Sequence, residues 1–260
     1  MTTLELYHGL GSTCSKKVRL CLYEKGLDWE SHVLNLQKFE QHDPAYLKLN
    51  PKGVVPTLVH DGKPIIESSR IIEYLDERFP EPPLRPADDM GRARMTKWTQ
   101  WSDDVGYGAV YIPTWDMLSR PVAQTLSDER LTQVLDAVPT VERRDRWRAV
   151  AREGFSQDKF DEAHAKMFST LEGMEAELED GPWLAGSGFS LADIAIVPFI
   201  ERIFDLRPEL EDDLARPRVS AWFAAMRERP SFEKAFFFQG IDTRMAAVRA
   251  SQIEAGLIEG

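Results

Sequence analysis

Length, composition and charge limit what this chain can be. The sequence has 260 residues, of which 43% are hydrophobic and 10% aromatic, so it can bury a sizeable core and is long enough for two modest domains. Its formal net charge of −11 opposes the electrostatic attraction that nucleic acid or an anionic membrane requires, and we expect neither as a partner.

The absence of targeting signals and the cysteine pattern favour a reducing compartment. The sequence opens with a strand pattern and contains no run of about 18 apolar residues. Cys14 and Cys21 would lie on one side of a helix, where they are poorly placed for a disulfide. We therefore expect a cytoplasmic protein. The two cysteines and five histidines show no metal-ligand spacing, so we expect no metal.

The first 80 residues alternate between strand and helix patterns and predict an α/β domain with the order βαβαββα. A short hairpin turns at Asp61-Gly62 and precedes the last helix of this domain. The expected ranges are 3–8 (strand), 13–25 (helix), 29–36 (strand), about 43–49 (helix), 57–60 and 64–66 (strands) and 67–78 (helix).

A proline-rich segment then separates this domain from a part in which only helical patterns remain. We expect a domain at 1–80, a linker at 81–88 and an all-α domain at 89–260. Its helices are expected at about 88–118, 156–179, 190–206, 217–228 and 231–238, followed by a polar tail. We interpret the charge-rich stretch 119–157 as a solvated insertion, which we favour over a lid above a cleft. Ser190 and Asp193 have the spacing of a capping box and are assigned a structural role.

Two neighbouring motifs together suggest a site for a peptide ligand. A strand that reaches Pro56 can turn outward through a cis peptide bond, which leaves the backbone N–H and C=O of Val55 free for an extended ligand. At the next helix start, the N–H groups near Ser68 suit a carboxylate and the Glu67 side chain suits an ammonium. The γ-glutamyl end of glutathione carries both groups. An ordinary hairpin and helix cap is the alternative, which the combination disfavours.

In order and separation, these motifs resemble those of the cytosolic glutathione transferases, and the resemblance covers nearly the whole chain. It implies a thioredoxin-like N-terminal domain, an all-helical C-terminal domain, glutathione as co-substrate and a homodimer. It also implies a role for each of several residues in binding glutathione. These are Gln41 and His42 for the glycyl end, Val55 beside Pro56 for the cysteinyl backbone, and Glu67 and Ser68 for the γ-glutamyl end.

Three local segments narrow the resemblance to the bacterial β-aryl-etherase branch, whose enzymes use glutathione to open the ether bond of lignin-derived dimers. The segments are Lys38–His42, Leu84–Asp88 and the insertion around Asp145–Phe155. This branch implies an aromatic ether as the second substrate.

The loop from Gly9 to Ser15 is the candidate catalytic segment. Glutathione reacts as a thiolate, and hydroxyl and N–H groups at a helix N-terminus stabilise negative sulfur. Ser12 is the first choice, because it falls where the resemblance places the serine of theta-like and delta-like members; Ser15 and Thr13 are held in reserve. Cys14 falls where beta-class members hold a cysteine that forms a mixed disulfide. The alternatives are helix capping for the hydroxyls and a small buried hydrophobic residue for Cys14.

The first long helix of the second part carries aromatic residues, several of which share one face at i,i+3 or i,i+4 spacing. Such a wall suits a phenyl-bearing substrate, and we select Tyr107, Tyr111 and Trp115 as substrate contacts. Core or dimer packing is the alternative for any single ring.

The leading hypothesis is a glutathione transferase in which thiolate attacks a carbon of a hydrophobic aromatic electrophile, either in detoxification or in cleavage of β-aryl ethers during lignin degradation. One alternative is a thiol transferase or glutathione lyase that depends on Cys14. Another is a glutathione-binding stress protein without enzymatic activity.

Overall fold

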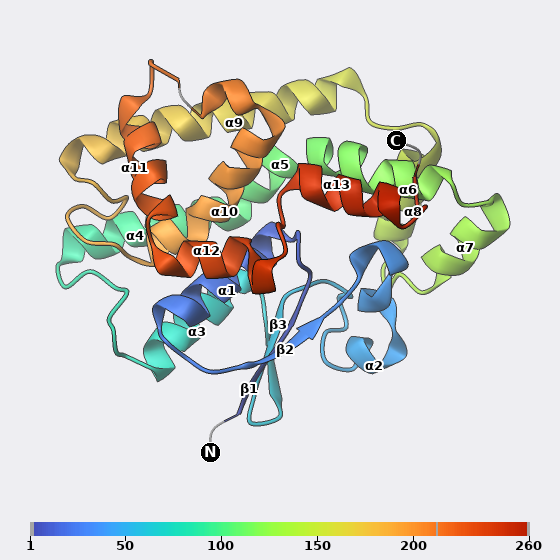
Figure 1. The fold of residues 1–260 in the computed structure, drawn as a ribbon, viewed down its shortest axis with the longest axis horizontal. Helices are drawn as coiled ribbons and strands as arrows, with labels where there is room; N and C mark the ends of the chain where they lie inside the picture. The colour runs from blue at the N-terminus through green and yellow to red at the C-terminus, as the bar shows by residue number, and fades with distance from the viewer. Residues whose placement is uncertain (1–2, 212, 259–260) are drawn as a thin grey trace.

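The structure is a computed structural model that describes residues 3–211 and 213–258, shown in Figure 1. The order βαβαββα predicted for the N-terminal part is confirmed. Its elements are β1 (Leu4–His8), α1 (Thr13–Glu24), β2 (Glu30–Val33), the short helices η1 (Leu36–Lys38) and η2 (Glu40–His42), α2 (Pro44–Leu47), β3 (Thr57–His60), β4 (Lys63–Ile66) and α3 (Ser68–Arg78).

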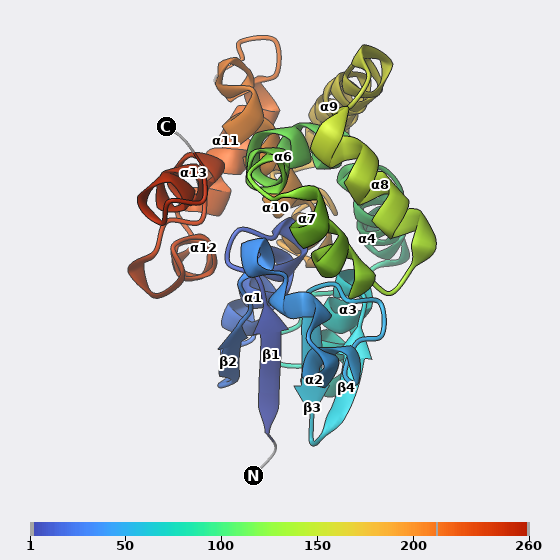
Figure 2. The ribbon, with the colours of Figure 1, turned by 90° about the vertical axis from the view of Figure 1, so that its right-hand side faces the viewer.

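The four strands form one mixed sheet in the order β2-β1-β3-β4, below the helical part in Figure 2. β1 runs parallel to β2 and antiparallel to β3, which pairs antiparallel with β4. Leu4, Leu6 and His8 alternate to the buried face of β1, as a period of two requires. The Val55–Pro56 peptide bond is cis, as the sequence predicts.

The rest of the chain is helical, and the ranges predicted for its long helices are reproduced within a few residues. The elements are α4 (Asp89–Trp101), η3 (Ser102–Gly106), α5 (Tyr107–Thr114), η4 (Trp115–Ser119), α6 (Arg120–Gln124), α7 (Asp128–Asp136), α8 (Val141–Arg152), α9 (Gln157–Glu177), η5 (Leu178–Asp180), α10 (Leu191–Leu206), η6 (Pro208–Leu210), α11 (Pro217–Arg227), α12 (Pro230–Phe236), η7 (Phe238–Gly240) and α13 (Met245–Glu254). Of these, η3 and η4 are π-helical turns.

One expectation about this part is wrong, and its last segment contains a helix that the sequence did not predict. The segment 119–157 is not a solvated insertion, because α6, α7 and α8 enclose a hydrophobic cluster of their own, against which Phe39 and Trp115 pack. Leu131 and Leu135 lie one helical turn apart and form part of that cluster. The tail after residue 238 is mostly exposed, and the helix not predicted there is α13, whose Met245 is buried.

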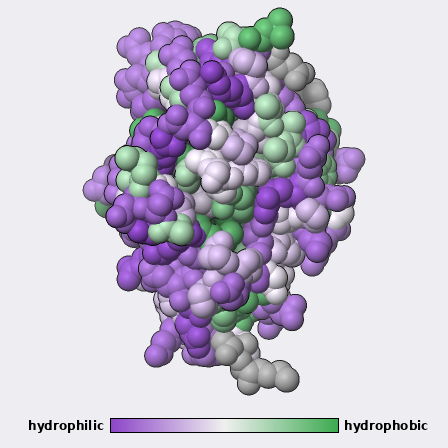
Figure 3. Space-filling model, turned by 90° about the vertical axis from the view of Figure 1, so that its left-hand side faces the viewer, coloured by the Kyte–Doolittle hydropathy of each residue, from purple (hydrophilic) through white to green (hydrophobic). Residues whose placement is uncertain are grey.

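One continuous core joins the sheet to the helical part, with buried side chains from β1, α1, α3 and α10 in the same cluster. α10 contacts α1, α3, α4 and α5. The division at residues 80 and 88 stays a prediction. The face shown in Figure 3 is mainly hydrophilic, with scattered hydrophobic residues. Within the described residues, none of the helices combines the length and apolarity needed to cross a bilayer.

The start of α10 is organised by a single buried carboxylate. Asp193 accepts hydrogen bonds from Leu184 N–H at 3.0 Å, Ser190 N–H at 2.9 Å and Trp222 Nε1–H at 2.8 Å. Burial raises the pKa of Asp193 to about 6, and these donors oppose the shift. The predicted capping box is therefore present and extends to a loop and to α11.

We expect Asp193→Ala to lower the free energy of unfolding by roughly 3 kcal/mol or more, because it leaves three buried donors without an acceptor. Urea denaturation measures the change, with the exposed Ser187→Ala in the preceding loop as the control. A loss no larger than that of the control would contradict this role.

Candidate active site

A cavity of about 610 Å³ lies between the N-terminal and helical parts. One wall comes from the loop after β1, the segment 33–41 and the residues before Pro56. The other walls come from α5, η4, α6, α8 and α13. The segments selected from the sequence for catalysis and for the substrate therefore face the same space.

Ser12 caps α1 at the edge of this cavity. Its Oγ accepts a hydrogen bond from Ser15 N–H at 3.3 Å, so the hydroxyl hydrogen stays free to donate to a ligand. Thr13 and Cys14 also line the cavity at the same helix end. An anionic sulfur here would meet the positive end of the helix dipole and a hydroxyl donor.

Ser15, the other hydroxyl selected for catalysis, lies elsewhere. It is fully buried and its Oγ accepts a hydrogen bond from Gly9 N–H at 3.2 Å. It does not line the cavity. Its side chain therefore stabilises the loop before α1, whereas the cap of α1 is Ser12.

Two buried arginines hold the carbonyl groups of the loop before Ser12. Arg19 donates to Gly9 O at 3.2 Å and to Leu10 O at 2.9 Å. Arg202 of α10 donates to Gly11 O at 2.8 Å and also lines the cavity. The negative ends of these peptide dipoles are therefore paired with cations, which removes a source of repulsion for a nearby thiolate.

His8, at the end of β1, supports the same arrangement. Its Nε2 lies 2.9 Å from Ser31 Oγ and its Nδ1 lies 3.1 Å from Arg19 Nη1. Because Arg19 can only donate, Nδ1 is the acceptor and the ring is neutral. Burial, with the charge of Arg19 second, lowers the pKa of His8 to about 3.

This shift predicts acid sensitivity. The unfolded chain protonates His8 near pH 6.5 and the folded chain only near pH 3, so its contribution to stability is complete above pH 6.5 and is lost as pH falls. We expect the wild-type free energy of unfolding to fall by about 1.4 kcal/mol per pH unit more steeply below pH 6.5 than that of His8→Asn. Urea denaturation between pH 4 and 7 tests this, and parallel pH profiles would contradict it.

The residues selected for the middle and the glycyl end of glutathione lie on one side of the cavity. Val55 and Gln41 line it, whereas Pro56 is buried next to it. His42 is buried and does not line the cavity; a Cβ on Gly53 would lie 2.8 Å from His42 Cδ2. Burial lowers the pKa of His42 to about 4, and the charge of Arg143 adds to the effect.

Glu67 and Ser68 stand at the start of α3 and are not among the residues that line the cavity. Glu67 has φ 72° and ψ 112°, a conformation that non-glycine residues rarely adopt and that is concentrated at functional sites. Its Oε1 lies 2.6 Å from Lys52 Nζ in an exposed ion pair. Ser69, to which the sequence analysis gave no role, accepts from Lys17 Nζ at 2.9 Å and donates to Asp103 Oδ1 at 2.7 Å.

The substrate wall is longer than the sequence predicts. Tyr107 stacks on Tyr111 at 4.9 Å between ring centroids, and Tyr111 lies 4.8 Å from Trp115. Trp147 of α8 continues the row 4.1 Å from Trp115 and reaches Phe39 at 5.4 Å. The three rings selected from the sequence do line the cavity, and the last two come from segments whose placement could not be predicted.

α13 closes the cavity and donates two side-chain hydrogen bonds to carbonyl groups of the neighbouring helix. Pro121 has no N–H, so Met117 O lacks its usual i+4 donor, and Arg249 Nη1 donates to it at 3.2 Å. Gln252 Nε2 donates to Leu118 O, in the same π-helical turn, at 3.0 Å. The helix irregularity is therefore the docking point of α13.

We expect the double variant Arg249→Ala, Gln252→Ala to speed amide hydrogen exchange across α13 by about tenfold or more, because two hydrogen bonds worth about 0.5–1.5 kcal/mol each are lost. The exposed Glu254→Ala is the control. Unchanged exchange in the double variant would show that other contacts hold α13.

The charges that line the cavity are mainly positive, although the chain carries a net charge of −11. They are Lys38, Arg143 and Arg202 against one carboxylate, Asp242, which is paired with Arg244 at 2.6 Å. A cavity of this sign favours an anionic ligand.

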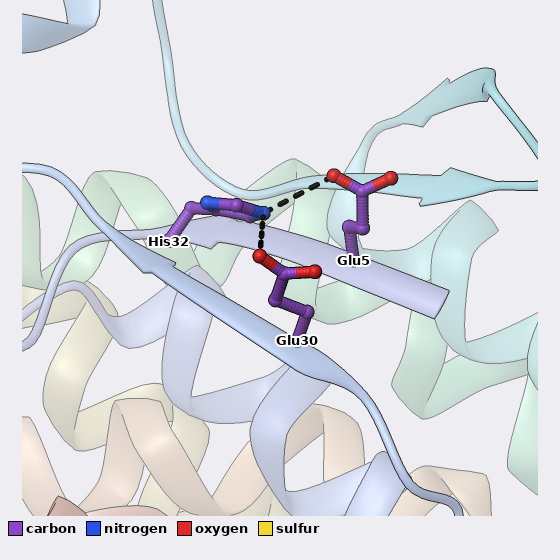
Figure 4. A group of neighbouring side chains, drawn as sticks. All are labelled: Glu5, Glu30 and His32. Atoms are coloured by element: carbon purple, nitrogen blue, oxygen red, sulfur yellow. Dashed lines mark hydrogen bonds and ion pairs between the residues drawn. The ribbon is translucent and has the colours of Figure 1, made fainter. Parts of the chain in front are cut away.

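A second polar group lies away from the cavity, on β1 and β2 (Figure 4). His32 Nε2 lies 3.1 Å from Glu5 Oε2 and 3.5 Å from Glu30 Oε1, and its ring stacks on Tyr7. Three potential metal ligands thus meet, but they already pair with one another and are partly exposed. The expectation of no bound metal stays a prediction.

Comparisons with known proteins agree with this geometry. Residues 6–83 match the family model described as glutathione S-transferase, N-terminal domain, and residues 142–225 match glutathione S-transferase, C-terminal domain. The chain is 37% identical over 240 residues to protein LigF of Sphingobium sp. (strain NBRC 103272 / SYK-6), which covers 90% of this chain and 93% of LigF. The chain belongs to the glutathione S-transferase family.

Solved structures support the same assignment. The crystal structure of β-etherase LigF from Sphingobium sp. strain SYK-6 superposes with a TM-score of 0.81 at 36% identity, over 90% of this chain and 98% of that chain. Glutathione transferase F7 from Populus trichocarpa gives a TM-score of 0.70 at 26% identity, over 90% and 97%. The predicted superfamily, the thioredoxin-like domain with a helical partner, and glutathione as co-substrate are confirmed.

Proposed function

We propose that this glutathione transferase activates glutathione as a thiolate beside Ser12 and transfers the sulfur to a carbon of an aromatic ether, with release of an aryloxide. One observation carries the proposal: the Ser12 helix end, the Val55 backbone and the aromatic row from Tyr107 to Trp147 line a single cavity. A nucleophile and an aryl electrophile bound in these places would be adjacent.

The glutathione half of the proposal uses the N-terminal part. Val55 pairs with the cysteinyl backbone beside Pro56, while Glu67 and Ser68 take the γ-glutamyl end and Gln41 with His42 the glycyl end. The thiol then meets the free hydroxyl hydrogen of Ser12 and the α1 dipole, which together lower the thiol pKa from its usual value of about 8.5.

The electrophile half uses the helical part. Tyr107, Tyr111 and Trp115 offer stacked faces on which a phenyl ring is desolvated. Sulfur forms a C–S bond as the C–O bond breaks, the electron pair leaves with the aryloxide oxygen, and a proton from solvent completes the phenol. The similarity to the β-etherase LigF supports an aryl ether over other electrophiles.

We expect Ser12→Ala to lower kcat/KM for an aryl ether by about a hundredfold and to raise the apparent pKa of its pH–rate profile, because one donor to the thiolate is lost. Cys14→Ala and Thr13→Ala are matched controls from the same helix end and should keep most of the activity. Full activity in Ser12→Ala would contradict the assignment.

A second candidate is a thiol transferase that uses Cys14, because this thiol also lines the cavity. In that reaction Cys14 sulfur attacks a mixed disulfide and glutathione thiolate leaves. Loss of disulfide turnover in Cys14→Ala, with aryl-ether turnover weak in the wild type, would favour this candidate.

We further propose a homodimer in the cytoplasm. The family resemblance supports the dimer, and two free cysteines fit a reducing compartment. Sedimentation analysis of the purified chain tests the dimer, and a monomer at micromolar concentration would contradict it.

A further inference from the structure

α8 brings one guanidinium group to the wall of the cavity. Arg143 lines the cavity, and its Nη1 donates to Lys52 O at 3.0 Å and to Gly53 O at 3.2 Å. Within the described residues, no carboxylate lies close enough to Arg143, at 4.0 Å or less, to form an ion pair. Two backbone acceptors use one of its nitrogens, and the donors on the other nitrogens remain for a ligand.

Tyr107 brings a second donor to the same cavity. Tyr107 is 48% exposed, and because the ordinary pKa of a tyrosine hydroxyl is about 10, this group is protonated at neutral pH and can donate. Arg143 itself is partly desolvated, which strengthens its interaction with a charged ligand atom. A cavity lined by a guanidinium and a neutral hydroxyl suits an oxygen atom that carries negative charge.

In the proposed reaction, the atom that develops negative charge on the electrophile is the ether oxygen. We propose that Arg143 stabilises the departing aryloxide oxygen and is a catalytic residue of this enzyme. The inference rests on the proposed function, because it requires ether cleavage. The C–S bond forms, the C–O bond breaks, the electron pair passes to the oxygen beside the guanidinium, and solvent supplies the proton.

The hydrogen bonds to the carbonyls of Lys52 and Gly53 fix the position of the Arg143 side chain. The two carbonyls belong to the loop that leads to Val55, so Arg143 holds α8 against the part that binds glutathione. The leaving oxygen would thus be met by a preorganised donor, which costs no rearrangement in the transition state.

The test compares two substrates that share a carbon skeleton: an α-aryloxy ketone and the same ketone with chloride in place of the aryloxide. We expect Arg143→Gln to lower kcat for the aryloxy ketone by about a hundredfold. The loss should grow as the leaving phenol becomes less acidic, because its oxygen then carries more charge in the transition state. Turnover of the chloro ketone should change by less than about threefold. Arg143→Lys should recover part of the loss because it keeps the charge.

Arg148→Gln is the matched control, because Arg148 lies on the same helix, is exposed and pairs with Asp145 rather than lining the cavity. Thermal unfolding of each variant shows whether the fold is kept. The glycyl carboxylate of glutathione is another negatively charged group that Arg143 could bind. Calorimetric titration with glutathione and with its glycyl monoester, in which this carboxylate is blocked, tests that role.

Three outcomes would overturn the inference. Equal cleavage of aryl ethers by wild type and Arg143→Gln would remove Arg143 alone and leave the proposed function intact. A second outcome is an equal loss of kcat for both ketones, together with an affinity of the variant for glutathione that is as low as the affinity of the wild type for the monoester. This outcome would assign Arg143 to the glycyl carboxylate. A wild type that uses the chloro ketone but cleaves no aryl ether would overturn the proposed function together with the role of Arg143.

Discussion

The geometry of the site depends on how α1 is held against α10. Lys16 Nζ donates to both carboxylate oxygens of Glu201, at 2.8 and 2.9 Å, and both side chains are buried. The next residue of α10, Arg202, binds the carbonyl of Gly11 directly before Ser12. Two consecutive residues of one helix therefore fix both the N-terminal turn of α1 and the loop that leads into it.

Such an arrangement contributes little net stability, because removing charges from water costs about as much as their pairing returns. Burial lowers the pKa of Lys16 to about 8, with Glu201 opposing the shift, so the ammonium is still mainly charged at neutral pH. The pair instead fixes the position of α1 along α10. A shift of one helix would separate the two charges and leave each buried without a partner, which costs several kcal/mol.

The N-terminal part was predictable because its signals are local. Alternation in β1, the turn at Asp61-Gly62 and the proline after Val55 each act within a few residues, and all appear in the structure as expected. The role of Ser12 as N-cap could also be predicted, because serine is a favoured residue directly before a helix. Which hydroxyl lines the cavity could not be predicted, because Ser15 is buried in a contact with Gly9 N–H that the local sequence does not show.

The helical side of the cavity was much less predictable, since its residues are brought together by tertiary contacts. Trp147 stands among arginines in a charge-rich stretch, and only its packing on Trp115 shows that it faces inward. α13 has a weak helical pattern of its own, and its side chains donate to carbonyls of a π-helical turn far earlier in the chain. No periodicity within residues 245–254 carries that information.

Charge illustrates the same separation between global and local properties. The net charge of −11 spreads over the surface, where salt screens it within about 8 Å at physiological ionic strength. Arg19 and Arg202 are buried directly behind the Ser12 loop, where screening is weak and the effective dielectric constant is low. A thiolate beside Ser12 would therefore respond to these few buried cations far more than to the acidic surface. An overall charge that argues against anionic macromolecules is for this reason compatible with a site that stabilises anionic sulfur.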